Sequence, residues 1–310
     1  MSEIKDNNKT EPCGVLVINK HKGVTSHDIV NRVRRLYGTR RVGHTGTLDP
    51  LATGVLVVLV GRAAKAAEYL VSDTKRYRAT LRLGVTTDSE DITGTVLTKS
   101  EAVPSAEQVI VACKQFRGEI MQVPPMYSAL KVDGKKLVDL ARQGQTVERK
   151  ARPITVFELD CVPTDASTDY VLEVKCSSGT YIRTLCADIG NALGCGGVMA
   201  TLERCETGGF SLDKSYTLDE LERMSETDRL ALLCPIEELF LSLPAVKLPA
   251  FYERLSRSGC EIYQKKIKTD FAEGSRVRMC NADGVFYALG EVRTYEDGTA
   301  IKAIKLFALE

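Results

Sequence analysis

The stretch that most constrains this chain is a polar loop that runs directly into an apolar segment. Residues 41–54 are rich in glycine and contain a single carboxylate, Asp49, while residues 55–60 are all apolar and predict a fully buried strand. Pro50 fixes its own φ and favours an extended backbone at Asp49, so the chain itself sets the direction of the carboxylate. An isolated Asp-Pro pair is more often an ordinary turn, because Asp bonds its own backbone, and this alternative stays open at this point.

The residues around Asp49 resemble the active-site loop of a known enzyme family. Residues 43–54 fit the pattern G-H-x-G-x-L-D-P-x-A-x-G, which is similar to the uridine-isomerising loop of the TruB-type pseudouridine synthases, the tRNA pseudouridine-55 synthases. The resemblance implies that Asp49 is the nucleophile. It also implies that His44 stacks in the place left by a flipped base and that Gly46 belongs to the RNA-binding part of the loop.

Composition limits the class of protein. At 310 residues with 44% hydrophobic content, the chain is long enough for a sizeable core and for two domains. We find no apolar run of membrane-spanning length and no signal-peptide pattern, which predicts a cytoplasmic protein without membrane contacts. Ten cysteines lie scattered without a C-x-x-C pair, which predicts reduced thiols. Only three histidines are present and none lies near a cysteine cluster, so the sequence predicts no metal site.

The net charge of +1 hides a strong segregation of charge along the chain. Residues 20–41 hold seven Lys or Arg against one Asp, residues 131–152 hold seven against three acids, and residues 217–238 hold two Arg against seven acids. Basic stripes suit a nucleic-acid groove, since phosphate contacts supply affinity that does not depend on sequence. Each stripe alone is more often a solvated face.

The first predicted elements place two lysines of interest. Residues 14–20 predict a short buried strand that ends in Lys20, and Thr25 with Asp28 predicts the start of a helix that Gly38 ends. Residues 62–72 are rich in alanine and predict a second helix, with Lys65 on one face. The family resemblance implies that Lys20 and Lys65 hold backbone or pocket groups.

A strand with strict alternation follows. Over residues 75–83, Tyr77 shares one face with Ala79 and Leu81, while arginines occupy the other face. A core tyrosine with a satisfied hydroxyl is an equally good interpretation of Tyr77 from this pattern alone. The residues K-R-Y resemble the second motif of the family, in which the tyrosine stacks on the target base. The acidic turn over residues 88–91 suggests no metal or phosphate chemistry.

A basic insert covers residues 122–152. It resembles the RNA-gripping thumb loop of the family, and it leads into a predicted helix that ends at Gly144. The resemblance implies that Lys131 and Arg142 bind RNA. An ordinary surface hairpin and helix would have the same pattern.

Residues 177–180 predict a turn with capping residues before a helix that ends at Gly194. Arg183 would lie in the first turn of this helix, where a cation opposes the helix dipole, so an anionic partner explains it better than helix propensity does; a solvated arginine is the alternative. The string S-G-T-Y-I-R-T resembles a family motif whose arginine pairs with the nucleophilic aspartate and whose tyrosine lines the pocket. The resemblance implies these roles for Arg183 and Tyr181 respectively. Leu202 falls where the family has a pocket-wall leucine, although a core leucine is the ordinary explanation.

The C-terminal part changes character. Residues 217–240 suggest two short acidic helices, and the chain from residue 244 is rich in predicted strands and glycine-containing turns. This tail resembles a compact PUA domain, an RNA-binding module. We therefore expect a polar leader over residues 1–13, a catalytic domain over 14–243 that contains the thumb, and a PUA-like domain over 244–310.

The resemblance implies the pseudouridine synthase α/β (α+β) fold, with a central mixed and mainly antiparallel sheet. The implied reaction converts uridine to pseudouridine in tRNA, at uridine 55 of the TΨC arm, with Asp49, Tyr77 and Arg183 as catalytic residues. A carboxylate can capture the sugar or the base covalently without a cofactor, and an opposite charge within about 4–6 Å would keep it ionised. The target base must be flipped out of its stack. We expect the T-arm of tRNA as the partner and a monomeric enzyme.

Two alternatives remain open from the sequence. One is a catalytically idle RNA-binding or RNA-folding protein on the same scaffold, and the other is an isomerase of the same class that acts on another RNA. A small-molecule hydrolase fits poorly, because neither a paired carboxylate nor a histidine base is in evidence.

Overall fold

The computed structural model describes residues 11–70, 74–132 and 134–307. The strands of its large sheet are β1 (Gly14–Lys20), β2 (Val42–His44), β3 (Thr53–Val60), β4 (Lys75–Leu83), β7 (Gly118–Gln122), β10 (Arg152–Pro163), β11 (Asp169–Cys176), β12 (Gly197–Thr207) and β13 (Phe210–Ser211). The principal helices around it are α1 (Ser26–Leu36), α2 (Ala106–Lys114), α4 (Ile182–Ala192), α5 (Leu218–Arg223) and α6 (Glu226–Ala231), with the 3₁₀ helices η1 (Gly61–Tyr69), η2 (Leu212–Lys214) and η3 (Ile236–Phe240).

Two further hairpins and the C-terminal elements complete the described part. The hairpins are β5 (Val85–Thr87) with β6 (Val96–Lys99), and β8 (Lys131–Val132) with β9 (Lys135–Lys136), the latter followed by α3 (Leu137–Arg142). The C-terminal elements are β14 (Ala245–Lys247), α7 (Ala250–Arg257), β15 (Ile262–Tyr263), α8 (Gln264–Ile267), β16 (Arg276–Cys280), β17 (Phe286–Tyr295) and β18 (Gly298–Leu306).

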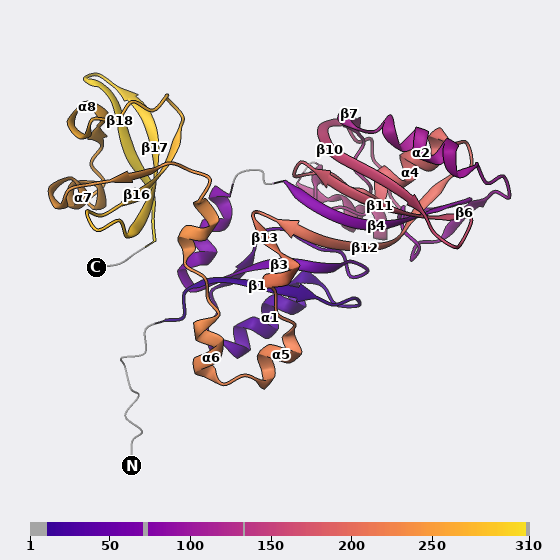
Figure 1. Cartoon of the computed structure of the whole chain (residues 1–310), viewed down its shortest axis with the longest axis horizontal. Coiled ribbons are helices and arrows are strands. Elements are labelled where there is room, and N and C mark those ends of the chain that lie inside the picture. Colours follow the sequence, from indigo (N-terminus) through magenta and orange to yellow (C-terminus); the bar gives the residue numbers. More distant parts are fainter. Residues whose placement is uncertain (1–10, 71–73, 133, 308–310) are drawn as a thin grey trace, which may run out of the picture.

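The described residues form two separate larger sheets (Figure 1). The large sheet runs β1-β3-β12-β4-β11-β10-β7, with β2 beside β3 and β13 beside β12, and the smaller sheet runs β14-β16-β17-β18-β15. In the large sheet β3 pairs with β12 in parallel, whereas the other recorded strand pairs are antiparallel. The predicted mixed and mainly antiparallel sheet, with a β-rich C-terminal part, is confirmed.

The strands β1 and β3 are covered on both faces. Leu16 and Ile18 face the main core, where α1 and α4 pack, whereas Val15 and Val17 face a second cluster with Phe210. A strand that is buried on both faces needs an unbroken apolar sequence rather than an alternating one. The prediction of a fully buried strand after the Asp49 loop, defined here as residues 45–52, is therefore confirmed.

Helix α1 begins and ends as its sequence predicts. The Thr25 side chain accepts a hydrogen bond from the Asp28 amide, and the Asp28 side chain accepts one from the Thr25 amide, which completes a capping box. Gly38 has a φ of +62°, a backbone conformation that glycine adopts without strain. The helix thereby brings Ser26 of its first turn against the Asp49 loop.

Strand β4 shows the predicted alternation. Tyr77, Ala79 and Leu81 are buried on the core side. On the opposite face Arg82 forms an ion pair of 2.7 Å with Asp169 of β11, and Arg78 pairs with Glu173. Tyr77 therefore reaches the inner side of the sheet from its centre.

Two local predictions need refinement. The helix predicted over residues 62–72 is present as the 3₁₀ helix η1, Gly61–Tyr69, and residues 71–73 lie outside the described residues. Helix α4 has Tyr181 as its N-cap without a side-chain cap of its own, so the residues 177–180 do not cap it. Residues 1–10 of the expected polar leader also lie outside the described part of the chain.

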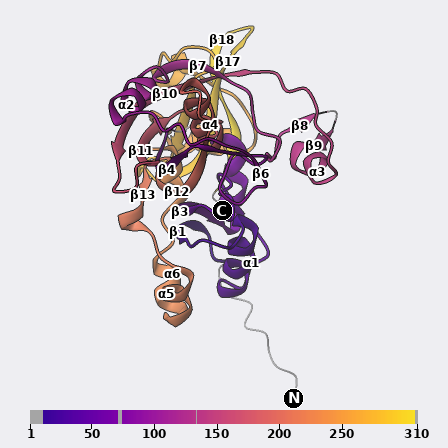
Figure 2. The same ribbon diagram turned by 90° about the vertical axis from the view of Figure 1, so that its right-hand side faces the viewer.

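The C-terminal sheet lies against the large-sheet part through η1 and η3 (Figure 1). Phe240 of η3 is buried against Phe286 and Phe307, with ring centroids 5.9 and 5.7 Å away. The hairpin β8–β9 and helix α3 stand out to one side of the molecule (Figure 2). Residue 133 lies outside the described residues.

Candidate active site

The Asp49 loop connects β2 to β3 and is held by backbone and side-chain hydrogen bonds. Ser26 of α1 accepts a hydrogen bond from the Leu48 amide at 2.8 Å and donates one to the Leu48 carbonyl at 3.1 Å. The Gly23 amide donates to the Pro50 carbonyl at 2.8 Å, and the Ala52 amide donates to the Asp49 carbonyl at 3.0 Å. The carboxylate of Asp49 is thus carried by a backbone that is fixed on both sides.

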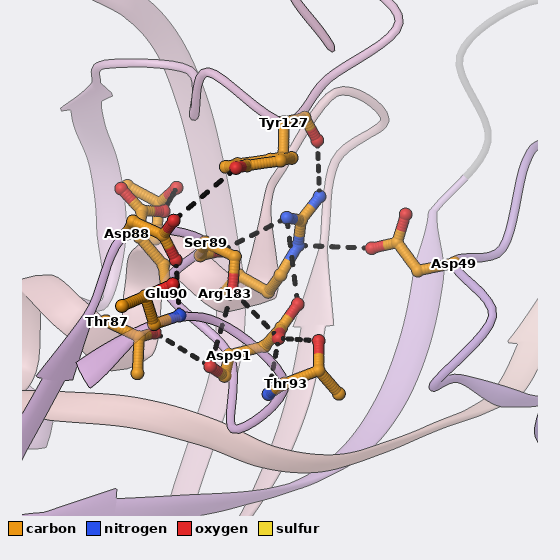
Figure 3. A network of polar contacts seen from close by, with 11 residues as sticks. Asp49, Thr87, Asp88, Ser89, Glu90, Asp91, Thr93, Tyr127 and Arg183 are labelled. Atoms are coloured by element: carbon orange, nitrogen blue, oxygen red, sulfur yellow. Dashed lines mark hydrogen bonds and ion pairs between the residues drawn. The ribbon is translucent and has the colours of Figure 1, made fainter. Parts of the chain in front are cut away.

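Asp49 and Arg183 form an ion pair, although 134 positions separate them in the sequence. The Nε atom of Arg183 lies 3.1 Å from the Oδ2 atom of Asp49, and the side chains are 7% and 38% exposed respectively (Figure 3). The arginine is therefore part of the protein interior, whereas the carboxylate faces an opening. This arrangement presents one oriented, accessible carboxylate.

The remaining nitrogen atoms of Arg183 are also bonded. The Nη2 atom donates to the Tyr127 carbonyl at 2.7 Å and the Nη1 atom donates to the Ser89 carbonyl at 3.2 Å, while the Asp91 carboxylate lies 3.9 Å from Nη1 (Figure 3). Because each of its three nitrogen atoms has a partner, the guanidinium is held in its orientation towards Asp49. The carbonyl of Tyr127 also connects it to the root of the basic insert.

Asp91 is itself held within a tight turn. Its Oδ1 atom accepts hydrogen bonds from the Ser89 hydroxyl at 2.9 Å, the Thr93 amide at 2.9 Å and the Thr93 hydroxyl at 2.5 Å. Glu90, between them, has a φ of +62° and accepts a hydrogen bond from the Thr184 hydroxyl. Burial raises the pKa of Glu90, and hydrogen bonding to Thr184 and the charge of Arg183 oppose that rise. The acidic turn, to which the sequence assigns no role, is the support of Arg183.

The ion pair borders a cavity of about 220 Å³. The structure brings together around it the predicted site residues Gly46, Asp49, Tyr77, Tyr181, Arg183 and Leu202. Tyr77 is 7% exposed and Leu202 is 9% exposed, so each offers only a narrow apolar surface to the cavity. Burial raises the pKa of the Tyr77 hydroxyl, and the positive charge of Arg204 counteracts that rise.

Lys20 lies fully buried behind the Asp49 loop. Its Nζ atom donates to the carbonyls of His21 at 3.1 Å and Val24 at 2.9 Å, so it holds the backbone between β1 and α1. Burial lowers its pKa to about 8; the charge of Asp49 opposes this shift and that of Arg204 adds to it. The lysine therefore feels the charges of the site without lining the cavity.

His44 lies at the end of β2, half-buried and outside the lining of the cavity. Burial lowers its pKa, and the charges of Arg204 and His27 lower it further. Its Nδ1 atom is buried without a hydrogen-bond partner among the described residues. An RNA-stacking role for His44 stays a prediction.

The structure does not bring the other predicted residues to the cavity. Lys65 is exposed on η1, and Lys131 and Arg142 are exposed on the projecting β8–β9 and α3 segment (Figure 2). An RNA-binding role for these three residues stays a prediction.

Two residues at the site escaped the sequence analysis. Gln122 of β7 caps α4, because its side chain accepts a hydrogen bond from the Tyr181 amide at 2.8 Å and donates one to the Tyr181 carbonyl at 3.1 Å. Arg204 of β12 is 1% exposed and lines the cavity two residues after Leu202. The sequence does hold a sign of Arg204, because this charged residue stands two positions after Leu202 and so on the same, buried face of the strand. Gln122 had no local signal, since its partner is distant in sequence.

No group of three or more His, Cys, Asp or Glu side chains in the described ranges could hold a metal ion. The ten cysteines are free thiols. Within residues 11–70, 74–132 and 134–307, we also find no helix of the length and apolar character that a membrane span requires.

Comparisons with known proteins agree with this geometry. Residues 34–182 match the family model described as TruB family pseudouridylate synthase (N terminal domain), and residues 183–240 match the model of the tRNA pseudouridylate synthase B C-terminal domain. A protein of Burkholderia mallei (strain NCTC 10247) named tRNA pseudouridine synthase B is 44% identical over 272 residues, which cover 87% of this chain and 90% of that protein. A protein of the same name from Francisella tularensis subsp. novicida (strain U112) is 42% identical over 259 residues, 83% of each chain.

The fold has solved counterparts as well. A chain in the crystal structure of a Cbf5-Nop10-Gar1 complex superimposes with a TM-score of 0.73 and 26% identity, over 95% of this chain and 85% of that one. The family models and the named relatives place the chain among the pseudouridylate synthases, which are isomerases. The chain belongs to the TruB family of pseudouridylate synthases.

Proposed function

We propose that this enzyme isomerises uridine to pseudouridine in tRNA, at uridine 55 of the TΨC loop. The observation that carries the proposal is the accessible Asp49 carboxylate, 3.1 Å from Arg183 at the wall of the cavity. The name tRNA pseudouridine synthase B of the Burkholderia and Francisella relatives supports the choice of tRNA.

The chemistry that the site must perform is an internal exchange of bonds. The bond from C1′ to N1 of uridine breaks and a bond from C1′ to C5 forms, while C5 loses a proton and N1 gains one, so atoms and electrons balance without a redox partner. Asp49 captures the sugar or the base covalently while the ring turns, which a carboxylate achieves without a cofactor. Arg183 keeps the Asp49 carboxylate oriented throughout.

The cavity suits a single flipped base. Its volume of about 220 Å³ is smaller than the roughly 300–1,000 Å³ typical of drug-sized ligands. Tyr77 stacks on the detached ring and helps in the removal of the proton at C5. Tyr181 and Leu202 limit the space around the ring. His44 fills the place that the base leaves in the RNA stack, which offsets part of the cost of flipping.

The RNA outside the cavity is held by exposed basic residues. Residues 122–152 form a thumb whose Lys131 and Arg142 contact phosphates. We assign residues 14–243 to the catalytic domain and residues 244–310 to a PUA-like domain that binds a further part of the tRNA, and we expect the enzyme to act as a monomer.

Release of tritium from C5-labelled uridine tests this proposal. The enzyme is mixed with a tRNA transcript, with an isolated T-arm hairpin and with a hairpin in which cytidine replaces uridine 55. We expect stoichiometric release from the first two RNAs and none from the third. Release from an unrelated ribosomal stem-loop but not from the T-arm would contradict the tRNA assignment, and tight binding without release from any RNA would favour the catalytically idle alternative.

A further inference from the structure

The side chain of Arg204 makes three separate contacts with the segment that carries Asp49. Its Nε atom donates to the Val55 carbonyl at 2.7 Å, its Nη2 atom to the Gly46 carbonyl at 3.0 Å and its Nη1 atom to the Thr47 carbonyl at 3.5 Å. Gly46 and Thr47 precede Asp49, whereas Val55 follows it. One planar fork thus bridges the two arms of the loop that presents the carboxylate.

The backbone of Arg204 lies between β3, which follows the Asp49 loop, and β4, which carries Tyr77. Across the sheet Arg204 pairs with Gly54 of β3 in parallel and with Tyr77 of β4 in antiparallel register. Gly54 has a φ of +98°, and a Cβ atom there would overlap the carbonyl oxygen of Arg204. The close approach of β3 to β12 at this point therefore depends on glycine.

Among the described residues, Arg204 is buried without an ion pair, whereas buried arginines are usually paired. Its residue is 1% exposed, and no carboxylate within ion-pair distance of it is recorded in the described part of the chain. Burying a guanidinium without an ion pair is costly unless its hydrogen bonds are satisfied. A leucine at this core position of β12 would pack without that cost, so the guanidinium points to a role in the site.

We infer that Arg204 is a positioning residue, which fixes the Asp49 carboxylate relative to the Tyr77 hydroxyl across the cavity. Arg183 orients the Asp49 side chain from one side, while Arg204 holds the backbone on which that side chain stands. The same guanidinium lies close enough to Tyr77 for its charge to act on the hydroxyl. The inference concerns this chain's reaction as an isomerase, and only its kinetic test rests on the proposed tRNA substrate.

The kinetic test compares Arg204→Met and Arg204→Lys with the unmodified enzyme under single-turnover conditions on the tRNA transcript. Methionine keeps length without charge or donors, and lysine keeps charge without the planar fork. Because a displacement of about 1 Å can cost about 100-fold in rate, we expect the rate constant at saturating enzyme to fall about 100-fold in Arg204→Met and about tenfold in Arg204→Lys. The Kd for tRNA should stay within about twofold in both variants.

Arg229→Met is the matched control. Arg229 of α6 also donates to backbone carbonyls, those of Leu221 and Met224, but it lies outside the lining of the cavity. We expect its rate constant to stay within about twofold of the unmodified enzyme. An equal loss in this control, or a folded Arg204 variant with an unchanged rate constant, would overturn the inference. A loss confined to the Kd would do the same.

Hydrogen exchange of the free protein supplies a readout that needs no RNA. In Arg204→Lys, which is the variant more certain to fold, the amides of Leu48 and Ala52 should exchange about tenfold faster than in the unmodified chain, while amides of α2 keep their rates. Unchanged exchange at Leu48 and Ala52 contradicts the inference. Inactivity of the unmodified enzyme on tRNA, with the exchange result as expected, counts against the proposed substrate alone.

Discussion

At the scale of single residues, the site is built from charges that the fold keeps out of water. Arg183 and Lys20 are almost entirely enclosed, whereas the Asp49 carboxylate is partly exposed. Buried charges persist when hydrogen bonds and nearby opposite charges satisfy them. Their ionisation therefore couples the stability of the molecule to pH.

Lys20 gives the clearest pH effect. Its folded-state pKa of about 8 lies below the ordinary 10.5, because burial disfavours the charged form. Between these values the unfolded chain holds a proton that the folded chain has released, so the free energy of unfolding rises with pH over that window. Urea titrations from pH 7 to 10.5 should show this rise, roughly 3 kcal/mol at most for the full shift, and Lys20→Met should lack it.

The exposed Lys65 supplies the control for that experiment. The variant Lys65→Met should follow the unmodified chain over the same pH range. If Lys20→Met and the unmodified protein gain stability in parallel between pH 8 and 10.5, burial does not shift the pKa of Lys20 in the way described.

At the scale of elements, helix α4 carries Arg183 in its first turn and the half-buried carboxyl of Asp188 in its middle. Asp188 lies near Glu90 of the acidic turn, and burial followed by the charge of Glu90 raises the pKa of Asp188 to about 6. This raised pKa contributes stability that is fully present below about pH 4 and lost as the pH rises through 6. At neutral pH the ionised Asp188 therefore lowers the free energy of unfolding.

Removing that charge should stabilise the protein. We expect Asp188→Asn to raise the free energy of unfolding by about 1–2 kcal/mol at pH 7.5, with the difference shrinking towards pH 4. Denaturant unfolding at several pH values measures it, with Asp165→Asn in an exposed turn as the control. A variant that is less stable than the unmodified protein at pH 7.5 would show that the carboxylate makes favourable contacts there.

The elements also show how far the sequence leads. Periodicity and capping predicted β1, α1, β3 and β4, because each is specified by its own residues. The family motifs predicted six residues of the cavity lining but not Arg204. The support of Arg183 by Asp91 and the cap of α4 by Gln122 join distant segments, which local patterns do not report. The helix predicted over 62–72 is present, but alanine content measures helix propensity and did not distinguish the 3₁₀ form of η1 from an α-helix.

At the scale of the whole molecule, the C-terminal sheet is fixed to the rest by an aromatic cluster and by polar contacts. Besides the three phenylalanine rings, Arg276 donates to the Tyr69 carbonyl at 3.0 Å and Lys305 pairs with Glu68 at 2.7 Å. These contacts favour a constant spacing between the cavity and the C-terminal sheet.

Removal of the central ring should uncouple the two parts. We expect Phe240→Ala to cost about 3–5 kcal/mol, as is usual for a buried phenylalanine, and to split thermal unfolding into two calorimetric transitions. Phe251→Ala, which removes a ring that is 58% exposed, is the control and should change stability by no more than about 0.5 kcal/mol. A single unshifted transition in Phe240→Ala would mean that the cluster does not hold the parts together.

The proposed mechanism depends on Asp49 as the nucleophile. The most direct measurement is tritium release from C5-labelled tRNA by Asp49→Asn, with Asp160→Asn as a surface control and with RNA binding measured in parallel. The account predicts that Asp49→Asn binds tRNA as the unmodified enzyme does and releases tritium at least about 1,000-fold more slowly, whereas Asp160→Asn is fully active. Release by Asp49→Asn at the unmodified rate would contradict it.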